Sequence, residues 1–285
     1  MAEVSSSHAA IAAPLRGVAL SDDEQMVVVL SVVLALATWI LWYRRLAGVR
    51  MRGPGAGARK LVGLAPPTAL LVIYAILQLG SAQDVRDSPP YLFQYTALGA
   101  AWLGVAMVTL GALGLSARAD VAERGNSAAA VALFGALSGL ALCFGGGNVG
   151  DGPGWWVVLF CAGLATAAWI ALWAIVARGS AILDSVGVDR DLAAGIRLAA
   201  YCLASGLILC RAVAGDWQSA GATLRDLASR GWPAVPLAAL VAALERPLGP
   251  TPRSPRGSTL LQGVLPGAAY VLAALVWVFS LGDWA

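Results

Sequence analysis

Residues 155–177 read WWVVLFCAGLATAAWIALWAIVA, a stretch in which no side chain is charged. At a rise of 1.5 Å per residue, about 20 such residues are enough for an α-helix to span the hydrocarbon core of a bilayer. A helix of a soluble protein would also present a polar face to water, and this stretch has none. It therefore predicts a membrane-spanning helix.

Similar apolar stretches recur along the chain, and together they predict an all-α, polytopic transmembrane helical bundle of about eight spans. The seventh stretch is weak because it is short and contains Pro233 and Pro236, which favours a re-entrant or interfacial segment. Pro266 is expected to bend the eighth. The predicted spans are 26–43, 61–80, 92–115, 127–145, 155–177, 192–213, 232–244 and 260–281.

The composition agrees with a membrane protein and argues against several kinds of catalytic and binding site. Apolar types make up 59% of the chain and charged types 12%, whereas soluble domains carry about 25% charged residues. A net charge of +3 is too small to indicate a nucleic-acid partner. His8 is the only histidine and lies in a Ser/Ala-rich tail, so most histidine-based catalysis and metal binding are unsupported. No catalytic, cofactor-binding or metal-binding residue is predicted, and zinc or redox spacing is missing among Cys143, Cys161, Cys202 and Cys210.

Charged residues around the spans predict the orientation. The first span is preceded by Asp22, Asp23 and Glu24 and followed by Arg44 and Arg45, an order that favours an uncleaved span with its amino end outside. Every second loop after it is rich in Lys and Arg, as cytoplasmic loops are. Both termini of this multi-pass protein are therefore expected outside the cytoplasm.

This alternation groups the spans into four helical hairpins. The predicted divisions are a polar N-terminal tail at 1–25, an N-terminal hairpin at 26–90, two duplicated central hairpins at 91–216 and a C-terminal hairpin with a weak first span at 217–285. The duplication is inferred from two similar cytoplasmic turns, which read ERGNSAAAV at 123–131 and VDRDLAAGI at 188–196.

Both turns contain a side chain that suits the N-cap position of the helix that follows. Asn126 and Asp191 can accept hydrogen bonds from first-turn amides. Together with Glu123 and Asp189 they form a candidate functional surface for a cytoplasmic protein partner; the alternative is that they only cap helices. The small residues that follow predict close helix packing, continued in a G-x-x-x-G spacing by Gly135 and Gly139.

The motif ERGNSAAA at 123–130 and its echo DRDLAAG at 189–195 resemble the YjfL-type bacterial membrane proteins, which carry the domain of unknown function 350. The resemblance covers residues 91–216, and the second copy departs from it because Asp191 replaces the usual Asn and Arg197 replaces an apolar residue. It implies repeated helix pairs in an inner-membrane protein tied to envelope stress or a conflict system. It implies no reaction and no catalytic residues.

Two arginines lie inside predicted spans. Arg197 comes six residues after Asp191, roughly 9 Å into its helix, and Arg211 follows on nearly the same face. An ionisable residue within a span is a functional hypothesis by default. The alternatives are snorkelling to the headgroups, a structural ion pair, or a path for an anionic solute. Candidate partners are Glu123 or Asp184 for Arg197 and Asp216 for Arg211. No acidic residue lies deep in any predicted span, so a carboxylate proton relay is unsupported.

Three functions remain open at this point. The first is a non-enzymatic membrane component with a structural or partner-binding role. Its partners would be the lipid bilayer and, in a homo-oligomer, a second copy of the chain. The second is a channel or transporter for a small solute, which duplicated hairpins would suit. The third is a membrane enzyme, the least supported because no catalytic set is evident.

Overall fold

The computed structural model describes residues 20–48, 55–249 and 258–282, and within them the chain is helical apart from turns and one isolated bridge between Ser81 and Gly150. The predicted tail residues 1–19, including His8, lie outside the described residues, as do residues 49–54 of the predicted basic loop after the first span. The helices are α1 (Asp22–Ala47), α2 (Ala56–Gly80), α3 (Gln83–Arg86), α4 (Pro89–Ala112), η1 (Ala117–Glu123), α5 (Ser127–Gly146), α6 (Trp155–Gly179), α7 (Ile182–Gly187), α8 (Leu192–Val213), α9 (Ala220–Gly231), α10 (Ala234–Leu248), η2 (Thr259–Val264) and α11 (Leu265–Ser280).

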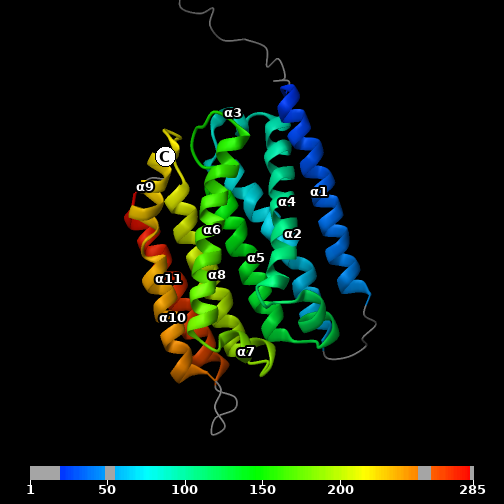
Figure 1. Ribbon diagram of the computed structural model, residues 1–285, viewed down its shortest axis with the longest axis vertical. Helices are drawn as coiled ribbons and strands as arrows, with labels where there is room; N and C mark the ends of the chain where they lie inside the picture. Colours follow the sequence, from blue (N-terminus) through cyan, green and yellow to red (C-terminus); the bar gives the residue numbers. More distant parts are fainter. Residues whose placement is uncertain (1–19, 49–54, 250–257, 283–285) are drawn as a thin grey trace, which may run out of the picture.

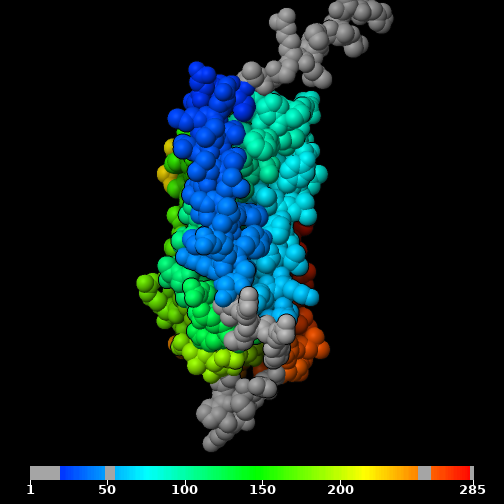
Figure 2. All heavy atoms as spheres, turned by 90° about the vertical axis from the view of Figure 1, so that its right-hand side faces the viewer, coloured from blue at the N-terminus to red at the C-terminus, as the bar shows by residue number. Residues whose placement is uncertain are grey.

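The long helices run side by side and form an elongated bundle (Figure 1). One end of the bundle, called here the turn end, carries η1 and α7; the other end carries α3. The second helices of successive hairpins form the centre, because α5 packs against both α2 and α8, and α8 packs against α11. The first helices lie outside this row, with α1 against α4 and α10 against α6. Figure 2 shows α1 lying along the outside of the bundle.

The closest helix contact joins α5 and α8 through glycines. A Cβ atom added to Gly135 or Gly139 would collide with the backbone of Ala199 or Cys202, and one added to Gly206 would lie 2.7 Å from the Cα of Gly139. Small residues allow helix backbones to approach this closely in a membrane, where tight van der Waals packing drives association. The two glycines of the predicted G-x-x-x-G spacing therefore lie at this central contact.

The outer helices expose apolar side chains, as a protein surrounded by lipid does. In α1, Val29, Leu30 and Val33 are each about three-fifths exposed. Soluble proteins rarely expose large contiguous apolar patches. Among the described helices, seven are long and apolar enough to cross a membrane, and the number rises to eight if α9 and α10 form one bent span. The chain is therefore a multi-pass membrane protein with an all-α fold.

The weak seventh stretch, predicted at 232–244, is part of a longer helical segment. Helices α9 and α10 meet at an angle of 41° and together run from the α3 end to the turn end (Figure 1). The break lies at Trp232 and Pro233, where the proline cannot donate a helical hydrogen bond. Helix α9 was missed because Arg225, Asp226 and Arg230 give it a polar face, so hydropathy indicated a loop.

The first helix also begins earlier than predicted, at Asp22 instead of residue 26. Ser21 and Glu24 form a capping box, in which each side chain bonds to the backbone of the other. The acidic residues of the first turn also suit the positive end of the helix dipole. These local interactions extend the helix beyond its apolar part.

Candidate functional site

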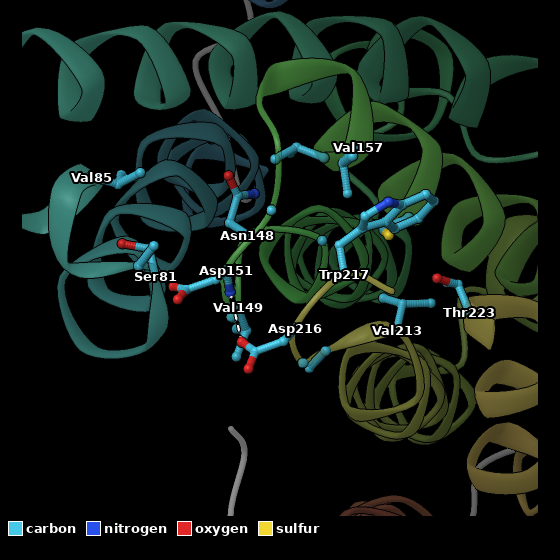
Figure 3. Close-up of a pocket in the computed structure, with 18 of the residues that line it drawn as sticks. Ser81, Val85, Asn148, Val149, Asp151, Val157, Val213, Asp216, Trp217 and Thr223 are labelled. Carbon is cyan, nitrogen blue, oxygen red and sulfur yellow. Dashed lines mark hydrogen bonds between the residues drawn. The ribbon is translucent and has the colours of Figure 1, made fainter. Parts of the chain in front are cut away.

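A polar cavity opens at the α3 end of the bundle, and we call it the vestibule. Its volume is about 420 Å³. It is lined by α3, by the loops 147–154 and 214–219, and by the adjoining ends of α1, α4, α6, α8 and α9. The lining therefore comes from segments far apart in the sequence, brought together where the hairpins end (Figure 3).

Two glycine-containing loops build its rim. Gly150 and Gly215 have φ angles of 94° and 127°, which other residues rarely adopt. The Gly150 N–H donates to the carbonyl of Gly80 over 3.1 Å, and the Gly215 N–H donates to the carbonyl of Val149 over 3.0 Å. The loop that contains Gly150 is thus hydrogen-bonded to the end of α2, and the loop that contains Gly215 is hydrogen-bonded to the loop 147–154. Because a Cβ on Gly150 would also meet the backbone of Gly215, the rim requires glycine there.

The residues that follow these glycines are acidic, and they join the two loops. The Asp151 N–H donates to the Asp216 carboxylate over 2.8 Å, and the Trp217 N–H donates to the Asp151 carbonyl over 2.7 Å. Both carboxylates are solvent-exposed at the opening. Figure 3 shows the first of these hydrogen bonds as a dashed line beside Trp217. The loop contacts therefore fix two carboxylates at the same rim.

Carboxylates outnumber cations around the vestibule. The lining contains two arginines: Arg230 lies 3.9 Å from the carboxylate of Asp226, which is itself in the lining, and Arg211 donates to the Leu281 carbonyl over 3.4 Å. The local charge balance is therefore negative. The acidic residues of the lining are Glu24, Asp84, Asp151, Asp216 and Asp226.

Aromatic side chains supply the apolar part of the lining. The indole of Trp217 is held by edge-to-face contacts with Trp156 and Phe160, at centroid distances of 5.4 and 5.6 Å. Tyr91 and Tyr95 line the cavity from α4. The vestibule thus combines fixed aromatic rings with carboxylates.

One lining side chain has an unused acceptor. Asn148 is 6% exposed, and its Nδ2 donates to the Phe144 carbonyl over 2.8 Å. Its Oδ1 is buried and has no hydrogen-bond partner within the described part of the chain. Buried polar groups are nearly always hydrogen-bonded. Among the described residues, this oxygen is therefore left without a protein donor.

The predicted N-caps lie at the turn end and act as such. Asn126 accepts from the Ala129 N–H over 3.1 Å, and Asp191 accepts from the N–H groups of Ala193 and Ala194 over 3.1 and 3.0 Å. The residue before each cap, Gly125 in one turn and Arg190 in the other, has a positive φ, of 64° and 55°. The two turns therefore share a local conformation.

Asn126 has a second contact that the sequence did not indicate. Its Nδ2 donates over 2.7 Å to the carbonyl of Val186 in the other turn, and Asn126 is 1% exposed. Glu123 forms an ion pair with Arg118 over 2.9 Å, whereas Asp189 is exposed. Asn126 therefore joins the two turns, and the accessible acidic groups are those of Glu123 and Asp189.

Arg197 forms a buried ion pair, but with neither of its predicted partners. Its Nε and Nη2 donate to the two carboxylate oxygens of Glu245 over 2.5 and 2.7 Å, and its Nη1 donates to the Gln262 carbonyl. Glu123 and Asp184 are therefore not its partners, and Glu245 directly follows the predicted apolar stretch 232–244. Helix α10 instead continues to Leu248, which places Glu245 in its last turn, inside the bundle.

Arg211 lies at the opposite end of α8 and is 4% exposed. It lines the vestibule, while Asp216, its predicted partner, accepts the Asp151 N–H. The two intramembrane arginines therefore occupy different environments, one sealed among helices and one beside a cavity.

Searches for similar proteins found no matching family model, no matching curated protein and no matching solved structure. The resemblance to the YjfL-type proteins remains a prediction. The features of the chain that bear on its function are therefore the vestibule and the turn end.

Proposed function

We propose that the chain is a non-enzymatic protein of the bacterial inner membrane that binds a small polar solute in the vestibule. The observation that carries this proposal is the Asn148 Oδ1, a buried and unused acceptor beside a cavity of about 420 Å³. Cavities that bind small molecules measure about 300–1,000 Å³ and combine apolar walls with a few polar groups. The vestibule has this size, and its lining combines aromatic side chains with a larger polar part.

The closed helix contacts below the vestibule favour binding over an open channel. A Cβ on Gly146 would lie 2.5 Å from the Cys210 carbonyl oxygen, so α5 and α8 touch directly under the cavity. Further along the same pair, Gly206 packs on Gly139. No continuous path along this contact is available to a solute in the described structure.

The side chains of the lining favour a binding role over catalysis. The Ser81 hydroxyl donates to the Leu77 carbonyl over 2.5 Å, and the Thr223 hydroxyl donates to the Ser219 carbonyl over 3.3 Å. A nucleophile needs a neighbouring base to accept its proton. These hydroxyls are directed at backbone oxygens instead.

The orientation proposed from the sequence places the vestibule outside the cytoplasm. Arg44 and Arg45 occupy the last turn of α1, at the turn end, opposite the vestibule. Basic residues gather on the cytoplasmic side. The solute would therefore reach the vestibule from the periplasm.

We further propose that the central hairpins are copies of one unit. The carbonyl of Asp120 accepts from the Asn126 N–H over 3.0 Å, and that of Ser185 accepts from the Asp191 N–H over 2.9 Å, six residues apart in both turns. At the other end, the Gly-Asp pairs beginning at 150 and 215 also correspond. A shift of 65 residues relates both sets of positions.

Solute binding is tested with purified protein and a panel of charged and neutral small molecules, by thermal unfolding and calorimetry. We expect at least one solute to raise the unfolding temperature, because a ligand that binds only the folded state stabilises it. Asn148→Leu should remove this shift, and Asp189→Asn at the turn end should keep it. A panel without any stabilising solute, or equal shifts in both variants, would contradict the proposal.

Partner binding at the turn end is a second candidate. It is favoured because Asn126 holds the two turns together while Glu123 and Asp189 stay accessible, which presents two acidic groups on a fixed surface. Reversing both charges, as Glu123→Lys with Asp189→Lys, should abolish complementation of a deletion strain without lowering protein abundance. Full complementation would exclude a role for this surface.

A further inference from the structure

The chemistry of the vestibule also limits which solute it can hold. Within the described chain, the carboxylates of Glu24, Asp84, Asp151 and Asp216 take part in no ion pair. The Asp216 carboxylate accepts a single backbone N–H, which leaves its second oxygen available. An anionic solute would meet repulsion from this set, so the charge favours a cation.

The unused groups are acceptors. Carboxylate oxygens only accept hydrogen bonds when ionised, and the Asn148 Oδ1 is an acceptor as well. An ammonium group carries donors and no acceptor. A protonated amine therefore matches both the charge of the vestibule and the hydrogen-bonding capacity of its buried oxygen.

The walls favour an organic cation over a metal ion. Trp217, Tyr91 and Tyr95 line the cavity, and aromatic faces attract ammonium groups and pack against alkyl chains. A bare metal ion would leave most of the 420 Å³ unfilled. In addition, the described residues contain no group of three or more His, Cys, Asp or Glu side chains placed to hold a metal.

We propose that the vestibule binds a protonated aliphatic amine, with its ammonium group among the carboxylates of Asp151 and Asp216 and its alkyl part against Trp217. This inference rests on the proposed solute-binding function and names the class of solute. The acidic rim alone would not support it. The buried acceptor of Asn148 and the fixed indole supply the independent reasons.

Three probes of similar length test the class: 1,4-diaminobutane, the neutral 1,4-butanediol and the anionic succinate. Binding to the purified full chain is measured by calorimetry at low and at high salt. We expect the diamine to bind and the other two to bind at least tenfold more weakly. The affinity for the diamine should fall as salt is raised, because exposed carboxylates are screened.

Two variants separate the site from a general charge effect. Asp216→Asn keeps an oxygen for the Asp151 N–H but removes the charge, and it should weaken diamine binding roughly tenfold, equivalent to about 1.4 kcal/mol. The matched control, Asp189→Asn, removes a carboxylate at the turn end and should leave the affinity unchanged. Equal weakening in both variants would show nonspecific attraction and overturn the site.

The outcomes distinguish this inference from the proposed function. Tighter binding of succinate or of the diol than of the diamine would overturn the amine class but keep a solute site. If none of the three probes binds, and 1-aminobutane fails as well, the amine class is refuted. Failure of the wider solute panel would refute the proposed function itself.

Discussion

The Arg197→Leu change tests the most deeply buried ionic contact in the described structure. Arg197 is fully buried and the Glu245 side chain is 3% exposed, so neither group can reach headgroups or water without rearrangement. Leucine would leave the Glu245 carboxylate buried without its partner. Removing one member of a buried pair costs about 3–5 kcal/mol, because the remaining charge stays desolvated.

Further variants show how much of this loss of stability comes from each of the two charges. Arg197→Lys keeps a charge but cannot reproduce the two parallel bonds to Glu245, so it should be less stable than the wild type and more stable than Arg197→Leu. The double change Arg197→Leu with Glu245→Leu removes both charges and should recover much of the loss. Arg178→Leu, at an exposed position, is the control and should be nearly neutral.

The assay is reversible unfolding of the purified protein in detergent, followed by tryptophan fluorescence and circular dichroism. Stability of Arg197→Leu within about 0.5 kcal/mol of the control, the usual range of surface substitutions, would refute the buried-pair reasoning. A double variant no more stable than the single one would also contradict it, since no stranded carboxylate would then explain the loss.

Further predictions concern packing, the turns and topology. Gly139→Leu should sharply reduce folded yield after detergent extraction, because its side chain would enter the Cys202 backbone, whereas Gly111→Leu should not, since nothing lies within 4 Å of that position; equal yields would contradict the close packing of α5 and α8. Asn126→Ser should destabilise the protein by about 1 kcal/mol more than Asp191→Ser, because serine can cap a helix but cannot donate to the Val186 carbonyl; identical melting curves for the two variants would count against that link. A reporter enzyme fused after residue 149 should report the outside, and a cytoplasmic signal there would overturn the hairpin scheme.

The spans could be predicted because apolar length is a direct physical requirement of crossing a bilayer. The same criterion failed at the seventh stretch, where polar residues lie within a helix. Arg225, Asp226 and Arg230 made α9 look like a loop. Glu245 likewise set the predicted end of an apolar stretch at residue 244. In the structure, Arg197 compensates its charge inside the bundle.

The vestibule could not be predicted in the same way, because its lining comes from segments that are distant in sequence. One signal was available. The pairs Gly150-Asp151 and Gly215-Asp216 each follow a long apolar stretch, and they lie where the two central hairpins end. The repeated motif instead pointed to the turns, where hydrogen bonds of Asn126 and Asp191 account for their side-chain chemistry.

The most direct test of the vestibule as an outward-facing solute site is the labelling rate of Gln218→Cys in intact cells. Gln218 is exposed and lines the vestibule, and the four native cysteines are buried, so the wild-type chain provides the background. We predict that a membrane-impermeant maleimide labels the new cysteine from outside and that 1,4-diaminobutane, but not succinate, slows the reaction. Labelling only after the cells are permeabilised, or at a rate that no solute changes, would contradict the account.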